Sequence, residues 1–175
     1  MPTITEGLAE IKTISKRIAK KQEFILQYLF RQEQVKDPLA KDGGSYGAIA
    51  REMQSVTDLL QRQVELRKAI HAANAETSLT IKGREMTLAD WIVWKREAAP
   101  ALQTFYGALR SRIAAARADL QKKGLTVAET ATNPKPNDVI IELDERGLAQ
   151  KIEDLEEVLG TLDGLLSLKN ATVVI

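Results

Sequence analysis

Cysteine is absent from this chain of 175 residues, which excludes disulfide bonds and thiolate-bound metals. Aromatic residues are scarce, at 5% of the sequence, and the 44% hydrophobic share relies mainly on Ala, Leu and Ile. That mixture suits closely packed helices better than a thick β-sandwich. No stretch approaches the roughly 18 consecutive apolar residues of a membrane-spanning helix. The N-terminal residues also lack the basic and apolar regions of a signal peptide. The absence of cysteine fits the assembly in a reducing cytoplasm that we expect.

An excess of one charge is also lacking, because the net charge is only +1. The balance is nevertheless uneven. Residues 1–36 hold seven Lys and Arg against four Asp and Glu, whereas residues 144–170 hold three against seven. These two segments are expected either to lie close together or to present solvated faces. The basic row of Lys12, Lys16 and Lys20 has no interleaved aromatic residues and the net charge is near zero, so we predict no nucleic-acid partner. The lack of a long apolar stretch likewise predicts no membrane partner.

Residues that could support catalysis are few. His71 is the only histidine, and its sequence neighbours supply no nucleophile, so an exposed helix residue is the favoured interpretation. Glu153 and Glu156 flank an apolar row, which favours a solvated face over a metal site. Gly43-Gly44 is not followed by the Lys and Ser or Thr of a phosphate-binding loop. We therefore predict no enzyme activity, catalytic residue, cofactor or metal, although folding could bring distant carboxylates together.

Two apolar repeats dominate what the sequence does contain. One places an isoleucine at every seventh position, and the other alternates spacings of four and three. Such rows form narrow apolar stripes along helices, and each stripe needs a partner helix. We predict a mainly α fold, built as a long antiparallel helical hairpin or bundle with a small β-hairpin and a short terminal strand. The two rows are Ile4, Ile11, Ile18, Ile25 and Leu148, Ile152, Leu155, Leu159, Leu162, Leu166.

Turn and capping residues divide the chain, which we treat as a single helical domain, into five segments. Thr3 and Glu6 have the spacing of a capping box, and the first helix should run to about Gln34. Lys82-Gly83 can close a tight β-turn, and Pro100 should kink or split the long helix that contains it. The segments are a helical hairpin at 1–74, a β-hairpin at 75–87, a long helix at 88–124, a connector and strand at 125–143, and a helix with a C-terminal strand at 144–175.

The β-hairpin end of the molecule is the best candidate for an association surface. Trp91 and Trp94 follow the hairpin closely, and aromatic residues are enriched at the centres of protein interfaces. A place in the core is the favoured interpretation for both residues, and the two interpretations are compatible. The C-terminal strand could join the hairpin in one sheet, or an unpaired strand edge could add to a neighbour's sheet. The candidate interface residues are Leu79, Ile81, Met86, Trp91, Trp94, Val173 and Ile175.

Residues 56–95 carry a family-like pattern. The matching positions are Asp58-Leu59-Leu60-Gln61-Arg62, Ala69-Ile70, Asn74-Ala75, Thr80-Ile81-Lys82-Gly83 and Thr87. This pattern resembles a group of small helical structural or accessory proteins of tailed bacteriophages. The resemblance covers about half of the chain and is one of pattern, without a diagnostic motif. It implies a part of the virion and carries no catalytic residues over.

From the sequence we therefore predict a non-enzymatic structural protein, a bacteriophage virion component that decorates the capsid or braces the head–tail junction. It would be assembled in the host cytoplasm, and its partners would be copies of itself and a capsid or other virion protein. The alternative is a cytosolic coiled-coil adaptor or regulator that binds one helical partner. Copy number on purified particles would separate the two.

Overall fold

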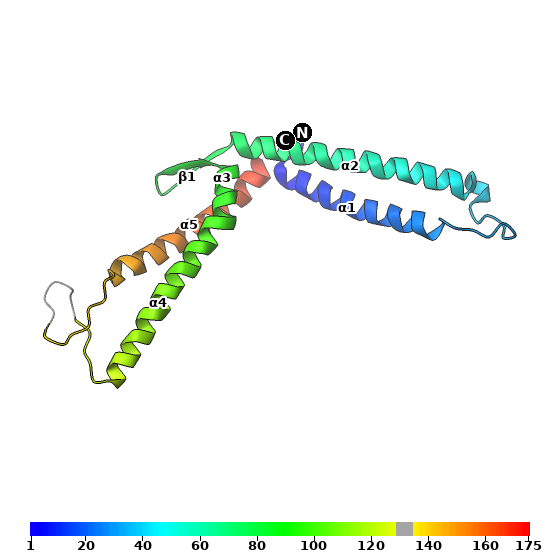
Figure 1. Cartoon of the computed structure of the whole chain (residues 1–175). Coiled ribbons are helices and arrows are strands. Elements are labelled where there is room, and N and C mark those ends of the chain that lie inside the picture. Colours follow the sequence, from blue (N-terminus) through cyan, green and yellow to red (C-terminus); the bar gives the residue numbers. More distant parts are fainter. Residues whose placement is uncertain (129–134) are drawn as a thin grey trace. The chain divides into compact units, whose positions relative to one another are not determined.

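A computed structural model of the chain describes residues 1–128 and 135–175. Residues 129–134 of the predicted connector lie outside the described part. The described chain is mainly α with one two-stranded antiparallel sheet, which confirms the predicted fold class at that level (Figure 1). In chain order the elements are α1 (Ile4–Gln27), a one-turn 3₁₀ helix (Ala40–Asp42), α2 (Gly44–Glu76), β1 (Ser78–Ile81), β2 (Arg84–Thr87), α3 (Leu88–Val93), a π-helical turn (Trp94–Ala98), α4 (Ala99–Lys122) and α5 (Glu145–Thr172).

The contacts of the chain divide it into two compact units, each described here by itself. Unit 1 comprises residues 1–77 and 166–175, and unit 2 comprises residues 78–165. Unit 1 therefore contains α1, α2 and the C-terminal end of α5. Unit 2 contains the sheet, α3, α4 and most of α5.

In unit 1, α1 and α2 pack side by side in antiparallel directions (Figure 1). Ile11, Ile14 and Ile18 of α1 form a buried cluster with Leu66 of α2. The capping box predicted at Thr3 starts α1, because the Thr3 hydroxyl accepts from the Glu6 amide while the Glu6 carboxylate accepts from the Thr3 amide. The isoleucine row of α1 therefore packs against α2.

Ion pairs lie beside the packed faces of α1 and α2, and they show the relative direction of the two helices. The Arg62 guanidinium donates to Glu10 at 2.9 Å, and the Lys21 ammonium donates to Glu52 at 2.6 Å. The early residue of α1 meets the later residue of α2, so the helices run in opposite directions. These pairs are partly exposed, so their contribution is small beside that of the buried isoleucines.

The loop between α1 and α2 begins earlier than predicted, because α1 ends at Gln27 and not near Gln34. Hydrogen bonds within the loop hold the chain out of the helix. The Asp37 carboxylate accepts from the amides of Leu39 and Ser45 and from the Ser45 hydroxyl. The Ser45 and Leu39 hydrogen bonds lower the pKa of Asp37, because they stabilise its charged form.

The two ends of the chain meet in unit 1. The Ile4 amide donates to the Val173 carbonyl at 3.0 Å, and the Ile175 amide donates to the Pro2 carbonyl at 2.8 Å. Only a single β-bridge forms, between Thr3 and Val174, in place of the predicted C-terminal strand. The residues favour an extended backbone, but the one segment beside them enters a helix at Ile4 and cannot extend the pairing.

In unit 2, β1 and β2 form the predicted hairpin, with Leu79 opposite Met86. Lys82 and Gly83 connect the strands, and both have positive φ, at 48° and 76°. A two-residue hairpin turn with two left-handed residues matches the right-handed twist of the strands. Alternation along β1 buries Leu79 and Ile81, so these side chains join the core of unit 2.

Pro100 affects the long helix of unit 2 as predicted, through a specific local change. Residues 94–98 form a π-helical turn, in which the Ala99 amide donates to the Trp94 carbonyl. Proline has no amide hydrogen, and its ring would clash with the carbonyl four residues earlier, so the regular α-helical pattern cannot continue there. The helix is therefore divided into α3 and α4 without a break in the chain.

The predicted strand at 139–143 does not form. Val139 makes only an isolated parallel bridge with Val127. A β-branched run needs a paired neighbour along its length, and no such neighbour lies beside it among the described residues. α5 then begins at Glu145, where the Asp144 carboxylate accepts from the Gly147 amide at 3.0 Å.

Candidate functional site

Three of the predicted interface residues lie in the core of unit 2. Trp91 is only 1% exposed, and Leu79 and Ile81 are also buried. The Trp91 indole donates to the Leu79 carbonyl at 3.1 Å, which satisfies the one polar group of this large side chain. These residues fix the hairpin to α3, and they have little surface to offer to a partner.

The other four candidates are more accessible and belong to different units. Met86 and Trp94 are half-buried in unit 2, where Trp94 packs edge-on against Trp91 with ring centroids 5.5 Å apart. Val173 and Ile175 are half-buried in unit 1. The structure thus gathers five of the candidates around the hairpin and places the other two in unit 1.

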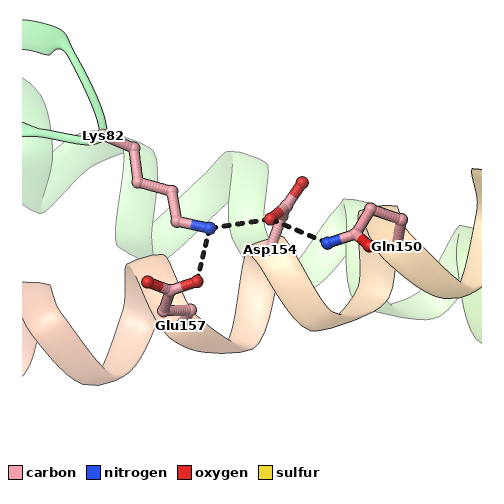
Figure 2. A network of polar contacts seen from close by, with 4 residues as sticks. All are labelled: Lys82, Gln150, Asp154 and Glu157. Carbon is pink, nitrogen blue, oxygen red and sulfur yellow. Dashed lines mark hydrogen bonds and ion pairs between the residues drawn. The ribbon is translucent and has the colours of Figure 1, made fainter.

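The hairpin turn is attached to α5 by an ion-pair network that sequence reasoning missed. Figure 2 shows the Lys82 ammonium between two carboxylates of α5. It donates to Asp154 at 2.7 Å and also pairs with Glu157, while the Gln150 amide donates to Asp154 at 3.3 Å. A lysine in a left-handed turn position is unusual, and this network gives its side chain a function there.

The network shifts the pKa of both partners. Hydrogen bonds to Asp154 and then to Glu157 raise the pKa of Lys82, and the hydrogen bond from Lys82, followed by that from Gln150, lowers the pKa of Asp154. Each group is thus held in its charged form. The arrangement can position the hairpin, but both groups stay charged near neutral pH and are unsuited to exchanging protons there.

A groove lies between α4 and α5, entirely within unit 2. Half-buried apolar side chains, among them Tyr106, Ile113 and Ile152, lie on its floor together with buried Leu148 and Leu155. The groove consists of two adjoining hollows of about 450 Å³ and 370 Å³. α4 and α5 approach each other less closely than α1 and α2 do. The groove therefore exposes part of the apolar seam of both helices.

The two walls of this groove carry opposite charges. Arg110 and Arg117 line the α4 wall, whereas Glu145, Glu153 and Glu156 line the α5 wall. Arg117 pairs with Glu145 across one end of the groove. Among the described residues, no ion pair is formed by Arg110, Glu153 or Glu156. The groove is thus apolar at its floor and polarised at its rims.

A second exposed apolar feature lies on α2, on a flank beside the face that packs on α1. Its members recur at spacings of seven, seven and four: Tyr46, Met53, Leu60 and Val64. Tyr46 is 92% exposed, Met53 57%, and Leu60 and Val64 46% each. Val56, Leu59 and Leu66 occupy the side of α2 that packs on α1. We call these four residues the outer row of α2.

Within residues 1–128 and 135–175, no group of three or more His, Asp and Glu side chains could hold a metal ion. His71 is an exposed residue of α2. No helix in the described ranges is long and apolar enough to cross a membrane. Comparison with known proteins identifies no family model, no curated protein and no solved structure that matches this chain.

The groove was not predicted from the sequence, although its signals are present there. Arg110, Ala114 and Arg117 recur at helical spacing, as do Glu145, Ala149 and Glu156. The apolar row of α5 was identified and was expected to pack on a partner helix. Only the separation of the two helices shows that the charged rows border a hollow.

Proposed function

We propose that this chain is a non-enzymatic structural protein that joins copies of itself to a larger assembly. That assembly would be a bacteriophage particle, in which the chain decorates the capsid or braces the head–tail junction. In the assembly its helices would form a long antiparallel hairpin or bundle. The observation that carries the proposal is the outer row of α2.

An exposed apolar row is costly unless something covers it. Burying a side chain of this size stabilises a complex by roughly 1.5–3 kcal/mol relative to leaving it in water. The outer row has the spacing with which one helix packs along another. Exposed apolar residues that gather on one face mark protein–protein contacts in soluble proteins. The row therefore suits a helix of another protein, here a virion protein.

The phage setting is supported by the resemblance of residues 56–95 to small proteins of tailed bacteriophages. That segment includes Leu60 and Val64 of the outer row and continues through the hairpin to Lys95. The alternative, a cytosolic coiled-coil adaptor, is favoured by the same row, because one row suits one helical partner. The two functions differ in stoichiometry.

Quantitative mass spectrometry of purified particles tests this proposal. We expect the chain in a fixed multiple that matches a symmetry of the capsid or of the head–tail junction. Leu60→Glu should lower its occupancy on particles at least about tenfold, because a charge replaces an apolar contact. The matched control, Ala72→Glu, adds the same charge at an exposed position of α2 outside the row.

Absence of the chain from particles would contradict the phage assignment. A complex with a single cellular protein at equal stoichiometry would favour the adaptor. Full occupancy by Leu60→Glu would remove the outer row from the assembly contact. Circular dichroism of both variants establishes that each retains its helices.

A further inference from the structure

We infer that the groove between α4 and α5 is the site where a second copy of this chain docks, using its own α4 and α5. The two pairs of helices would then complete a four-helix bundle. The inference rests on the proposed function only in requiring that copies of the chain associate. It assigns that association to unit 2, whereas the outer row of α2 serves the larger assembly.

Charge complementarity identifies the occupant. α4 holds four basic residues against one acidic residue, whereas α5 holds three basic residues against six acidic ones. One helix therefore carries +3 and the other −3. An arbitrary helix would match one wall of the groove and oppose the other. A second α4–α5 pair carries both charges in equal amounts and can satisfy both walls.

The same charges select one of two possible twofold arrangements. If the twofold axis lies across the helices, α4 faces α4 and α5 faces α5, so like charges meet. If the axis runs along the helices, α4 of each copy lies over α5 of the other, so opposite charges meet. Neighbouring helices are antiparallel in both arrangements, as is usual in four-helix bundles, so the charges alone decide between them. We infer the second arrangement.

Ion pairs within one chain show which residues of α4 and α5 lie at the same height along the groove. Arg117 meets Glu145 near one end, and Lys95 meets Asp163 toward the other, so α4 and α5 run in opposite directions. A twofold axis that runs along the helices leaves each residue at the same height in the second copy. Arg110, which lines the same hollow as Glu156, would then meet Glu156 of the second copy. This is the ion pair that the single chain does not form.

Space for close approach is present along both walls. Gly107, which lines the groove, has no atom within 4 Å of the position that a Cβ would occupy. Ala114 and Ala149 also line the groove with short side chains. Helices approach closely where small residues lie at the contact, so a second copy could bury Tyr106, Ile113 and Ile152.

Charge reversal in the full chain tests the pairing. Sedimentation equilibrium should show a dimer of the natural chain that weakens as salt concentration rises. Arg110→Glu alone, and Glu156→Arg alone, should each weaken dimerisation at least about tenfold, because like charges then meet twice in one symmetric interface. An equimolar mixture of the two variants should recover dimerisation as a heterodimer.

The mixture separates pairing between copies from pairing within one chain. Each variant by itself keeps two like charges at these positions, so recovery can come only from contacts between the two different chains. The matched control is Arg112→Glu, which makes the same charge change on α4 at an exposed residue outside the groove. It should leave the dimerisation constant within about twofold of the natural value.

Introduced thiols test the orientation, since the chain contains no cysteine of its own. A114C copies mixed with A149C copies should cross-link to each other under mild oxidation, because an axis along the helices brings these levels together. Neither variant alone should cross-link efficiently. Cross-linking of A114C to itself would support the axis across the helices and would overturn the inferred arrangement.

A natural chain that stays monomeric at the highest soluble concentration would overturn the inference, and so would a mixture that fails to recover. Filling of the groove by a helix of another protein, or by a small apolar molecule, would appear as a monomer with that occupant bound. None of these results changes the occupancy of the chain on particles. The particle measurement can fail in turn while the dimer persists, so the two proposals fail separately.

Discussion

Helices in both units bury an apolar residue at every seventh position, but the helices of unit 1 pack more closely than those of unit 2. In unit 1 every seventh residue of α1 from Ile4 to Ile18 is buried, and in unit 2 every seventh residue of α5 from Leu148 to Leu162 is buried. Yet α1 and α2 lie close together, whereas α4 and α5 leave a groove. Equal periodicity therefore produces unequal packing.

The position of small residues explains the difference. In unit 1, Gly7, Ser45 and Ala48 are buried, and a Cβ on Gly7 would lie 3.4 Å from a methyl group of Ile70 on α2. In unit 2, Gly107 and Gly160 face open space. Small residues at a contact let helices approach, whereas small residues beside a contact leave a hollow. An apolar period thus identifies the inward face of a helix without fixing the distance to its neighbour.

The largest expected effect is on the free energy of unfolding, when the same Ile→Ala substitution is made in each unit. Ile14→Ala should lower the free energy of unfolding by about 2–5 kcal/mol, because Ile14 is buried and its removal leaves a cavity. Ile113→Ala on the groove floor should cost less than roughly half of that, because this side chain is already partly exposed to water. Urea unfolding at low protein concentration measures both. Equal losses would show that the groove is closed in solution.

An intermediate effect is expected at Trp91, which holds the hairpin of unit 2. Trp91→Phe removes the hydrogen bond to the Leu79 carbonyl and part of the packed ring, so we expect a loss of roughly 1–3 kcal/mol. The same change at half-buried Trp94, whose indole donates no hydrogen bond within the described chain, is the matched control. Thermal unfolding followed by circular dichroism gives both values. A smaller loss at Trp91 than at Trp94 would contradict its place in the core.

The smallest effect is expected at Lys82, and it depends on pH. The lowered pKa of Asp154 means that its contribution to stability is present at neutral pH and is lost as pH falls through that folded-state pKa. The raised pKa of Lys82 means that its contribution is lost only as pH rises through that higher value. Lys82→Met should therefore be less stable than the natural chain at about pH 7, and the difference should shrink toward about pH 2.

Urea unfolding across that pH range checks the Lys82 prediction. Lys82→Arg keeps the positive charge and the same backbone constraint, so it should retain most of the pH dependence. A constant difference between Lys82→Met and the natural chain at every pH would assign the effect to the turn, where a long side chain at positive φ is disfavoured.

Local sequence signals predicted most element boundaries where a nearby residue determines the conformation. Thr3 starts α1 through a side-chain cap, and Lys82-Gly83 forms the turn that its residues indicate. Each depends on residues only a few positions apart. The isoleucine and leucine rows likewise identified the buried faces of α1 and α5, because helical geometry fixes which residues share a face.

Features that depend on distant partners were not predicted. Residues 139–143 favour an extended backbone, yet no strand lies beside them in the described chain, so only the Val139 bridge forms. The Lys82 network needs α5 to lie beside the hairpin, and spacing along the chain does not show this. The groove depends on a distance between two helices, and that distance is set by packing across the whole of unit 2.

The π-helical turn at 94–98 has a consequence for how α3 and α4 could vary in length. Such a turn contains one residue more than an α-helical turn, so this stretch carries one surplus residue. Loss of a residue elsewhere in α4 would rotate everything beyond it by about 100° and carry the groove wall away from α5. Loss of Pro100 would instead remove the surplus and its cause together, joining α3 and α4 as one regular helix with both inward faces still aligned.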